Sequence, residues 1–273
     1  MNDKYDESAD DICKFLGEYA EIVQGGLSER WQKLPVEIYN AETYEAIGGL
    51  LARQATLTIN LALTPKIWNG HIAPLILRSM TDAEITLAWI LIDPHDRARK
   101  YILYGLGQEK LAIEHLKEAY ARSGEKDERL KQGIEAREGW LNSQRVDFLT
   151  EVNVGHWAGK DTRTMAEEAD CKSLYDFAYQ PFSGPTHSMW QHVGRYNLRG
   201  CNNPLHKYHR VPVITEQDPD IDYVYRSAIY ITECYERVDE KYGLQIDTPL
   251  PASWFVEEFD RIFCADKEMP AQE

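Results

Sequence analysis

Apolar residues recur every three or four positions along most of the chain, which is the period of one face of an α-helix. The first clear apolar stripe runs from about Glu37 to Leu63, and a second runs from Ile72 to Leu91. Prolines follow both stripes closely, at positions 65 and 94, where a missing backbone N–H does little harm. Further helices are expected over residues 94–120, 126–150, 164 onward and 220–242, and a last helix that contains Trp254 and Ile262 is expected after Pro251.

Strand patterns are missing, because no run of about four to eight residues alternates cleanly between apolar and polar positions. The sequence therefore predicts an all-α fold, a single-domain helical bundle of about eight helices. Irregular structure is expected around Pro181 to Pro185 and again from Gly200 to Pro219, where a His-rich loop lies. We divide the chain into an N-terminal helical segment (1–35), an all-α helical domain (36–265) and a loose tail (266–273).

Two adjacent glycines, Gly48 and Gly49, lie inside the first of these apolar stripes. Glycine is unfavourable inside a helix, since it loses more backbone freedom on folding than alanine does. The pair therefore predicts a place where another helix crosses closely.

The overall charge is strongly acidic, because 45 Asp and Glu outnumber 30 Lys and Arg and give a formal net charge of −15. This balance argues against a protein coated with nucleic acid, since phosphate binding needs clustered basic residues. No apolar run approaches the roughly 20 residues of a membrane-spanning helix, so no membrane partner is expected. Five cysteines do not suggest a disulfide framework, and a reducing cytoplasm is the expected location. Self-association into a homo-oligomer stays open.

One segment departs from the acidic average. From Phe177 to Thr215 there is no Asp or Glu, and four of the eight histidines lie there with Arg195, Arg199, Lys207 and Arg210. A cationic, imidazole-rich segment suits an anionic ligand such as phosphate, or RNA. The alternative is that the segment pairs with the protein's own carboxylates, for which Asp82 and Glu84 are candidates.

Three residues of this segment are of types that bind zinc: Cys201, His206 and His209. The turn at Asn203-Pro204 could bring them together, although their spacing matches no standard zinc finger or ribbon. A structural site would need a fourth ligand, for which His187, His192 and Cys171 are candidates. Otherwise Cys201 is a small buried apolar residue, the histidines hold backbone carbonyls, and no cofactor is expected.

The spacing from Arg199 to His206 matches the Arg-x(4–6)-His motif of HEPN-type ribonucleases, which are small helical bundles. In that chemistry the 2′-hydroxyl of RNA attacks the adjacent phosphate without a metal, histidine transfers the proton and arginine stabilises the phosphate charge. Gly200 and Pro204 lie between the two residues and argue against the helix start that the motif normally occupies.

Arg78 and Asp82 are four positions apart on an expected helix, so they can form an ion pair. We expect either a structural salt bridge or a ligand-facing Arg78. In the second case this helix would complete an anion pocket with His187 or His206 as acid and base, and Arg199 or Arg210 as phosphate clamp. The remaining expected pocket residues are Trp190 and His209.

Two blocks of sequence resemble a bacterial family of helical proteins known only as a domain of unknown function. One block runs from Arg78 to Asp82 and continues at Ile85-Thr86-Leu87-Ala88-Trp89. The other contains His187-x-x-Trp190 and then Cys201-x-Asn-Pro-Leu-His206-x-x-His209-Arg-x-Pro212. The resemblance covers about Glu42 to Tyr242 and implies a helical fold, with a distant likeness to HEPN proteins by fold analogy.

Three hypotheses remain open at this stage. The first is a pocket for an anionic ligand; if the pocket is catalytic, the protein is a metal-independent ribonuclease. The second is a non-catalytic helical interaction module in which the His-rich loop is a structural clasp. The third is a zinc clasp built on the same loop.

Overall fold

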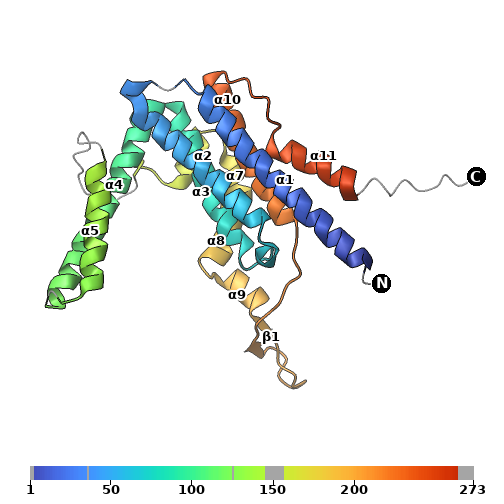
Figure 1. Ribbon diagram of the computed structural model, residues 1–273. Helices are drawn as coiled ribbons and strands as arrows, with labels where there is room; N and C mark the ends of the chain where they lie inside the picture. The colour runs from blue at the N-terminus through green and yellow to red at the C-terminus, as the bar shows by residue number, and fades with distance from the viewer. Residues whose placement is uncertain (1–2, 36, 125, 145–156, 264–273) are drawn as a thin grey trace, which may run out of the picture.

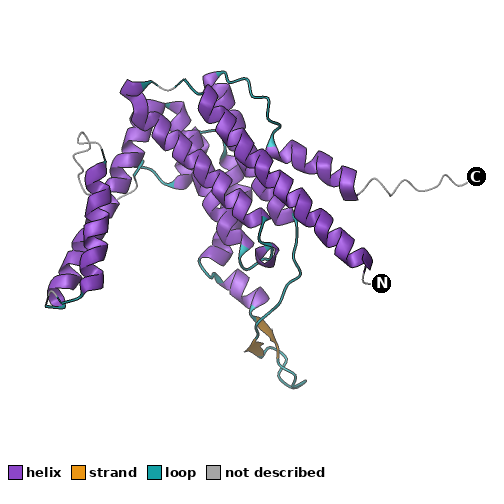
Figure 2. Cartoon of the chain, viewed as in Figure 1, coloured by secondary structure: helices purple, strands orange, loops and turns teal. Residues whose placement is uncertain are grey.

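Helices dominate the protein, which confirms the predicted all-α fold (Figures 1 and 2). The computed structural model describes residues 3–35, 37–124, 126–144 and 157–263. The tail expected at 266–273 lies outside these residues. None of the helices within the described ranges has the length and apolarity needed to cross a membrane.

Five helices form the body of the protein, and α3 lies at its centre with Leu77, Met80, Leu87 and Ile90 fully buried. Helices α2 and α10 both pack along α3, because each presents an apolar stripe to it. Short 3₁₀ turns at Ile38–Asn40 and Pro65–Ile67 flank α2. The five helices are α1 (Asp3–Lys33), α2 (Ala41–Ala62), α3 (Ala73–Ile92), α10 (Asp222–Tyr242) and α11 (Pro251–Phe263).

Helix α1 is joined to this body by both apolar and ionic contacts. Phe15 and Tyr19 are buried against the aromatic side chains of α11. Arg30 is only 1% exposed and binds Asp239 on α10 through two hydrogen bonds of 2.9 and 2.6 Å. The predicted N-terminal segment (1–35) and the predicted helical domain (36–265) therefore share one core. The boundary between them stays a prediction.

The glycine pair on α2 lies where α1 crosses. A Cβ placed on Gly48 would be 2.6 Å from Cζ3 of Trp31 on α1, so the indole ring or the helices would have to shift. A Cβ on Gly49 would meet nothing within 4 Å. The expected close crossing is present, and Gly48 is the residue that permits it.

Helices α4 (Pro94–Arg122) and α5 (Glu128–Ser143) form a helical hairpin that extends away from the body (Figure 1). The side chain of Asp127 caps α5 by accepting hydrogen bonds from the backbone N–H groups of residues 129 and 130. Ile134 is the buried residue of α5, so this helix is held mainly along a narrow seam.

The region around Pro181 to Pro185 is helical, so the expectation of irregular structure there is wrong. Helix α7 (Lys172–Leu174) continues through a π-helical stretch (Tyr175–Tyr179) into α8 (Gln180–Thr186). Pro181 lies in the first turn of α8, where proline is tolerated, and packing against α3 holds the rest of the helix. Helices α6 (Thr162–Glu168) and α9 (Trp190–Tyr196) lie before and after this region. These short helices bring the described residues above the predicted number of about eight helices.

A two-stranded hairpin replaces part of the predicted irregular loop. Strand β1 (Leu198–Gly200) pairs antiparallel with β2 (Arg210–Pro212), with Arg199 opposite Val211. The hairpin projects from α9 beyond the helical body (Figures 1 and 2). Strands of three residues are too short to show an alternating pattern, which is why the sequence did not predict them.

Candidate metal centre

The tip of the hairpin is shaped by hydrogen bonds that remain within it. Asn203 makes a turn in which its side-chain oxygen accepts from the backbone N–H of Leu205 at 3.0 Å and its carbonyl accepts from that of His206 at 3.0 Å. A second turn follows, in which the N–H of His209 donates to the carbonyl of His206 at 3.0 Å. The N–H of Cys201 then donates to the carbonyl of His209, which brings the two ends of the tip together.

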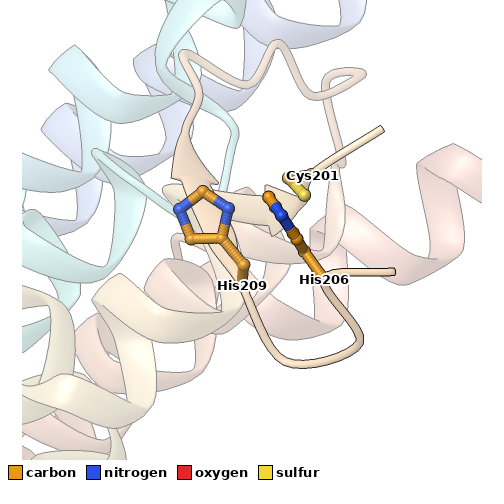
Figure 3. A group of neighbouring side chains, drawn as sticks. All are labelled: Cys201, His206 and His209. Atoms are coloured by element: carbon orange, nitrogen blue, oxygen red, sulfur yellow. The ribbon is translucent and has the colours of Figure 1, made fainter. Parts of the chain in front are cut away.

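These turns gather Cys201, His206 and His209 at one place (Figure 3). The thiol sulfur and one nitrogen of each imidazole all lie within 4.8 Å of one another. Tetrahedral zinc with thiolate and imidazole ligands separates its ligand atoms by about 3.3–3.8 Å, as follows from bond lengths of about 2.0–2.3 Å. Both histidines are exposed, so small side-chain rotations would close this gap.

Asn203 also contacts two members of this cluster. Its side-chain nitrogen lies 3.2 Å from Nε2 of His206, and its carbonyl oxygen accepts a weak bond from the Cys201 thiol at 3.8 Å. Neighbours of this kind fix the orientation of metal-binding side chains. Asn203 therefore contacts both the sulfur and one of the imidazoles that would hold a metal here.

The fourth ligand expected from the sequence is not part of the cluster. Cys171 is buried with Trp89 and Met165 in a smaller apolar cluster beside the main core, and burial raises the pKa of its thiol to about 11. The ring of His192 packs against His71 and Tyr196, with centroids 5.4 and 4.9 Å apart. Within the described part of the chain, the cluster has three members, and His187 is not among them. A metal held by three protein ligands keeps one coordination position open.

The other residues of the expected anion pocket are spread along the hairpin and the helices before it. Arg199 is exposed on β1, and Arg210 on β2 donates from Nη1 to the carbonyl of Gly194 at 3.1 Å. His187 is the exposed C-terminal cap of α8, and Trp190, which begins α9, is 70% exposed. Arg199 lies on a strand and His206 in a turn, and neither lies at the start of a helix, which the HEPN motif normally occupies.

Arg78 points into the protein and is bound by groups of the protein itself. Its side chain is 8% exposed, its Nε donates to Oγ of Ser183 at 3.0 Å, and its Nη1 pairs with Asp82. The guanidinium also lies 3.2 Å from the ring centroid of Tyr179 in the π-helical stretch. Burial raises the pKa of Asp82, and the charge of Arg78 opposes this. The predicted Arg78–Asp82 pair is thus present, and it joins α3 to the helix that carries Ser183.

Glu84 and Arg237 are two charged residues that the sequence did not place together. Glu84 was one of two candidates for balancing the cationic segment; it is 2% exposed, and the positive charge of Arg237 on α10 acts on it. The sequence did contain one sign that Glu84 is buried, because this acidic residue lies between Ala83 and Ile85 in a strongly apolar helix. The partner on α10 is distant in sequence and had no such signal.

The sequence of the chain matches a known protein family. A family model described as "Family of unknown function (DUF5677)" matches residues 44–204. The chain belongs to this family. The match includes Arg78, Asp82, Glu84, His187 and Cys201 and ends at Pro204, so the part of the expected signature from Leu205 to Pro212 lies beyond it. No curated protein and no solved structure matches the chain.

Proposed function

We propose that the protein binds a zinc ion through Cys201, His206 and His209 at the tip of its hairpin. The observation that carries this proposal is the convergence of one sulfur and two imidazole nitrogens within 4.8 Å. A thiolate and two imidazoles bind zinc well, whereas magnesium and calcium prefer oxygen ligands. The His-rich loop then has a zinc ion as its ligand, as in the third hypothesis from the sequence.

The open coordination position gives the site a second property. Arg199, Lys207 and Arg210 are exposed on the same hairpin, and a bound zinc ion would add its positive charge to theirs. The metal-bearing tip therefore suits an anionic group, such as a phosphate, as the fourth ligand. In this form the anionic-ligand hypothesis survives without Arg78, which is bound by Asp82 and Ser183.

A metal analysis of untagged protein tests the proposal directly. We expect stoichiometric zinc in the wild type and its loss in Cys201→Ser, His206→Ala and His209→Ala. His95→Ala, which removes an exposed histidine of α4, is the matched control and should retain zinc. In cobalt-loaded protein, a thiolate-to-metal absorption band should be present in the wild type and absent from Cys201→Ser.

Two outcomes would contradict the proposal. One is a wild type that takes up no zinc from metal-buffered solution, and the other is a set of three variants that bind zinc as the wild type does. An RNA-cleavage assay is run in parallel with and without a chelator. Cleavage by metal-free protein that is lost in His206→Ala would support the HEPN-like ribonuclease hypothesis instead.

The proposed compartment follows from the proposed ligand. Cys201 must be a reduced thiol to bind zinc, and a cytoplasmic location provides the reducing conditions. Cys201 is free in the structure, as are Cys13, Cys171 and Cys234.

A further inference from the structure

A second candidate site lies in the helical body, in a cleft of about 470 Å³ between α3, α10 and the helix formed by α7 and the π-helical stretch. Its charged lining residues include Glu84 from α3 and Arg226, Glu233 and Arg237 from α10. Arg226, Glu233 and Arg237 follow one another at intervals of seven and four positions, so they lie on one side of α10. The volume is within the range of small-molecule sites in proteins.

Glu84 is the unusual residue of this cleft. Its side chain is 2% exposed, and its Oε2 has no hydrogen-bond partner. A buried carboxylate without a partner is costly, because it loses its hydration and gains nothing in return. Buried polar groups in native proteins are nearly always satisfied, so this carboxylate requires an explanation.

Arg237 faces the same space and is only partly satisfied. Its Nη1 donates to the carbonyl of Ala169 at 3.5 Å, while its buried Nε has no partner. Glu84 and Arg237 are close enough to influence each other electrostatically, yet neither Oε2 of Glu84 nor Nε of Arg237 has a hydrogen-bond partner among the described residues. The cleft thus presents an acidic group and a basic group that are both available.

The chemistry of the lining restricts the ligand. Glu233 and Asp170 also line the cleft, so an anion alone would meet repulsion as well as attraction. A metal ion is disfavoured, since the described residues place no metal-binding group of three here. The lining also includes the apolar side chains of Leu174, Phe177 and Ile229, which suit a hydrocarbon linker.

We propose that this cleft binds a small zwitterionic molecule, with its ammonium or guanidinium group against Glu84 and its carboxylate against Arg237. One end of such a ligand satisfies Oε2 of Glu84 and the other satisfies Nε of Arg237, each by a charge-assisted hydrogen bond. The proposal is independent of the metal site, because none of the zinc-binding residues lines the cleft.

Thermal-shift and calorimetric titrations with four probes test this proposal. The probes are γ-aminobutyrate and L-arginine as zwitterions, and n-butylamine and butyrate as molecules with a single charge. We expect both zwitterions to raise the melting temperature of the wild type, and the singly charged probes to have no effect. Zwitterions that leave the melting temperature unchanged would overturn the proposal.

Two variants of the full chain separate binding from folding. Glu84→Gln keeps the shape of the side chain and should weaken zwitterion binding by about tenfold or more, the usual effect of losing a hydrogen bond to a charged group. Glu236→Gln changes an exposed carboxylate of α10 outside the cleft and should bind as the wild type does. Circular dichroism checks that Glu84→Gln remains helical, and a folded Glu84→Gln with wild-type affinity refutes the assignment.

Discussion

Two buried charges on α3 differ in how well they are satisfied. Arg78 has a hydroxyl, a carboxylate and an aromatic ring as partners, whereas the Oε2 atom of Glu84 has none. A satisfied buried charge rigidifies the protein around it, and an unsatisfied one reduces stability. We therefore assign a structural role to Arg78 and a ligand-binding role to Glu84.

The role of Arg78 is tested by replacing it with lysine. A lysine keeps the charge but cannot bind Ser183 and Asp82 while its side chain stacks on Tyr179. Arg78→Lys should lower the free energy of unfolding by about 1–3 kcal/mol, as measured by urea denaturation. Arg53→Lys, on an exposed position of α2, should have little effect. Equal stability of the two variants would show that Arg78 does not hold these helices together.

The buried state of Glu84 predicts a dependence of stability on pH. Burial, together with repulsion from Glu233, raises the pKa of Glu84 well above 4.5, while Arg237 opposes the rise. The unfolded chain therefore releases this proton at a lower pH than the folded chain, so Glu84 destabilises the fold as pH rises above about 4.5. Below pH 4.5, Glu84 is protonated in both states and does not reduce stability. Above pH 4.5, the loss of stability continues until the pH exceeds the pKa of Glu84 in the folded protein.

Denaturation of Glu84→Gln across the pH range checks this prediction. The variant has no proton to lose at this position, so its stability relative to the wild type should increase above pH 4.5, by at most about 1.4 kcal/mol per pH unit. Parallel pH profiles for the two proteins would show that Glu84 keeps an ordinary pKa.

At the residue scale, the sequence was informative only about neighbours along one helix. The Arg78–Asp82 pair follows from a spacing of four, which is fixed by helical geometry. Ser183, the second partner of Arg78, lies 105 positions further along the chain, and only the packing of α8 on α3 brings it near. The Glu84–Arg237 cleft was missed for the same reason.

At the scale of elements, long helices could be predicted and short elements could not. The apolar stripes of α2, α3 and α10 extend over several turns, so their period is visible in the sequence. Helix α8 contains Pro181, Gly184 and Pro185, which favour turns locally, and contact with α3 overrides that preference. The Cys201–His206–His209 cluster could be named from residue types, but its closure depends on the hairpin.

The two glycines of α2 provide a matched pair for testing the crossing of α1 and α2. Gly48→Ala should lower the free energy of unfolding by about 1–3 kcal/mol, because its methyl group would overlap Trp31. Gly49→Ala should raise it by about 0.5–1 kcal/mol, since alanine is the better helix former and the space there is open. Thermal denaturation compares the two variants, and a stabilising Gly48→Ala would mean that Trp31 can move aside.

At the scale of the whole molecule, the two candidate sites occupy different environments. The cleft is in the helical body, whereas the hairpin projects from it and carries exposed arginine, lysine and histidine on a protein of net charge −15. The chain-level charge predicted an acidic exterior and concealed this cationic projection. Composition averages over the surface, so it cannot show where a local excess lies.

The projection of the hairpin predicts that its tip can be replaced without harm to the fold. The hydrogen bonds found at residues 201–209 stay within the hairpin. Replacing residues 202–208 by Asn-Gly, which favours a two-residue hairpin turn, should preserve the helical circular dichroism and the melting temperature in metal-free buffer. The same variant should no longer be stabilised by added zinc, which raises the melting temperature of the wild type.

A clear fall in the melting temperature of this variant without metal would contradict the separation of tip and body. It would support the hypothesis that the His-rich loop is a structural clasp.

The π-helical stretch before α8 restricts the length of the chain as well as its composition. A π-turn is equivalent to an α-helix that has received one additional residue. Each residue rotates an α-helix by about 100°, so losing that residue would turn everything beyond Tyr179 by more than a quarter of a revolution. Ser183 would then face away from Arg78, and the start of α9 and the hairpin would be redirected. The distance in sequence between Cys171 and Ser183 is therefore a structural requirement, and a single-residue deletion there should be more harmful than most substitutions.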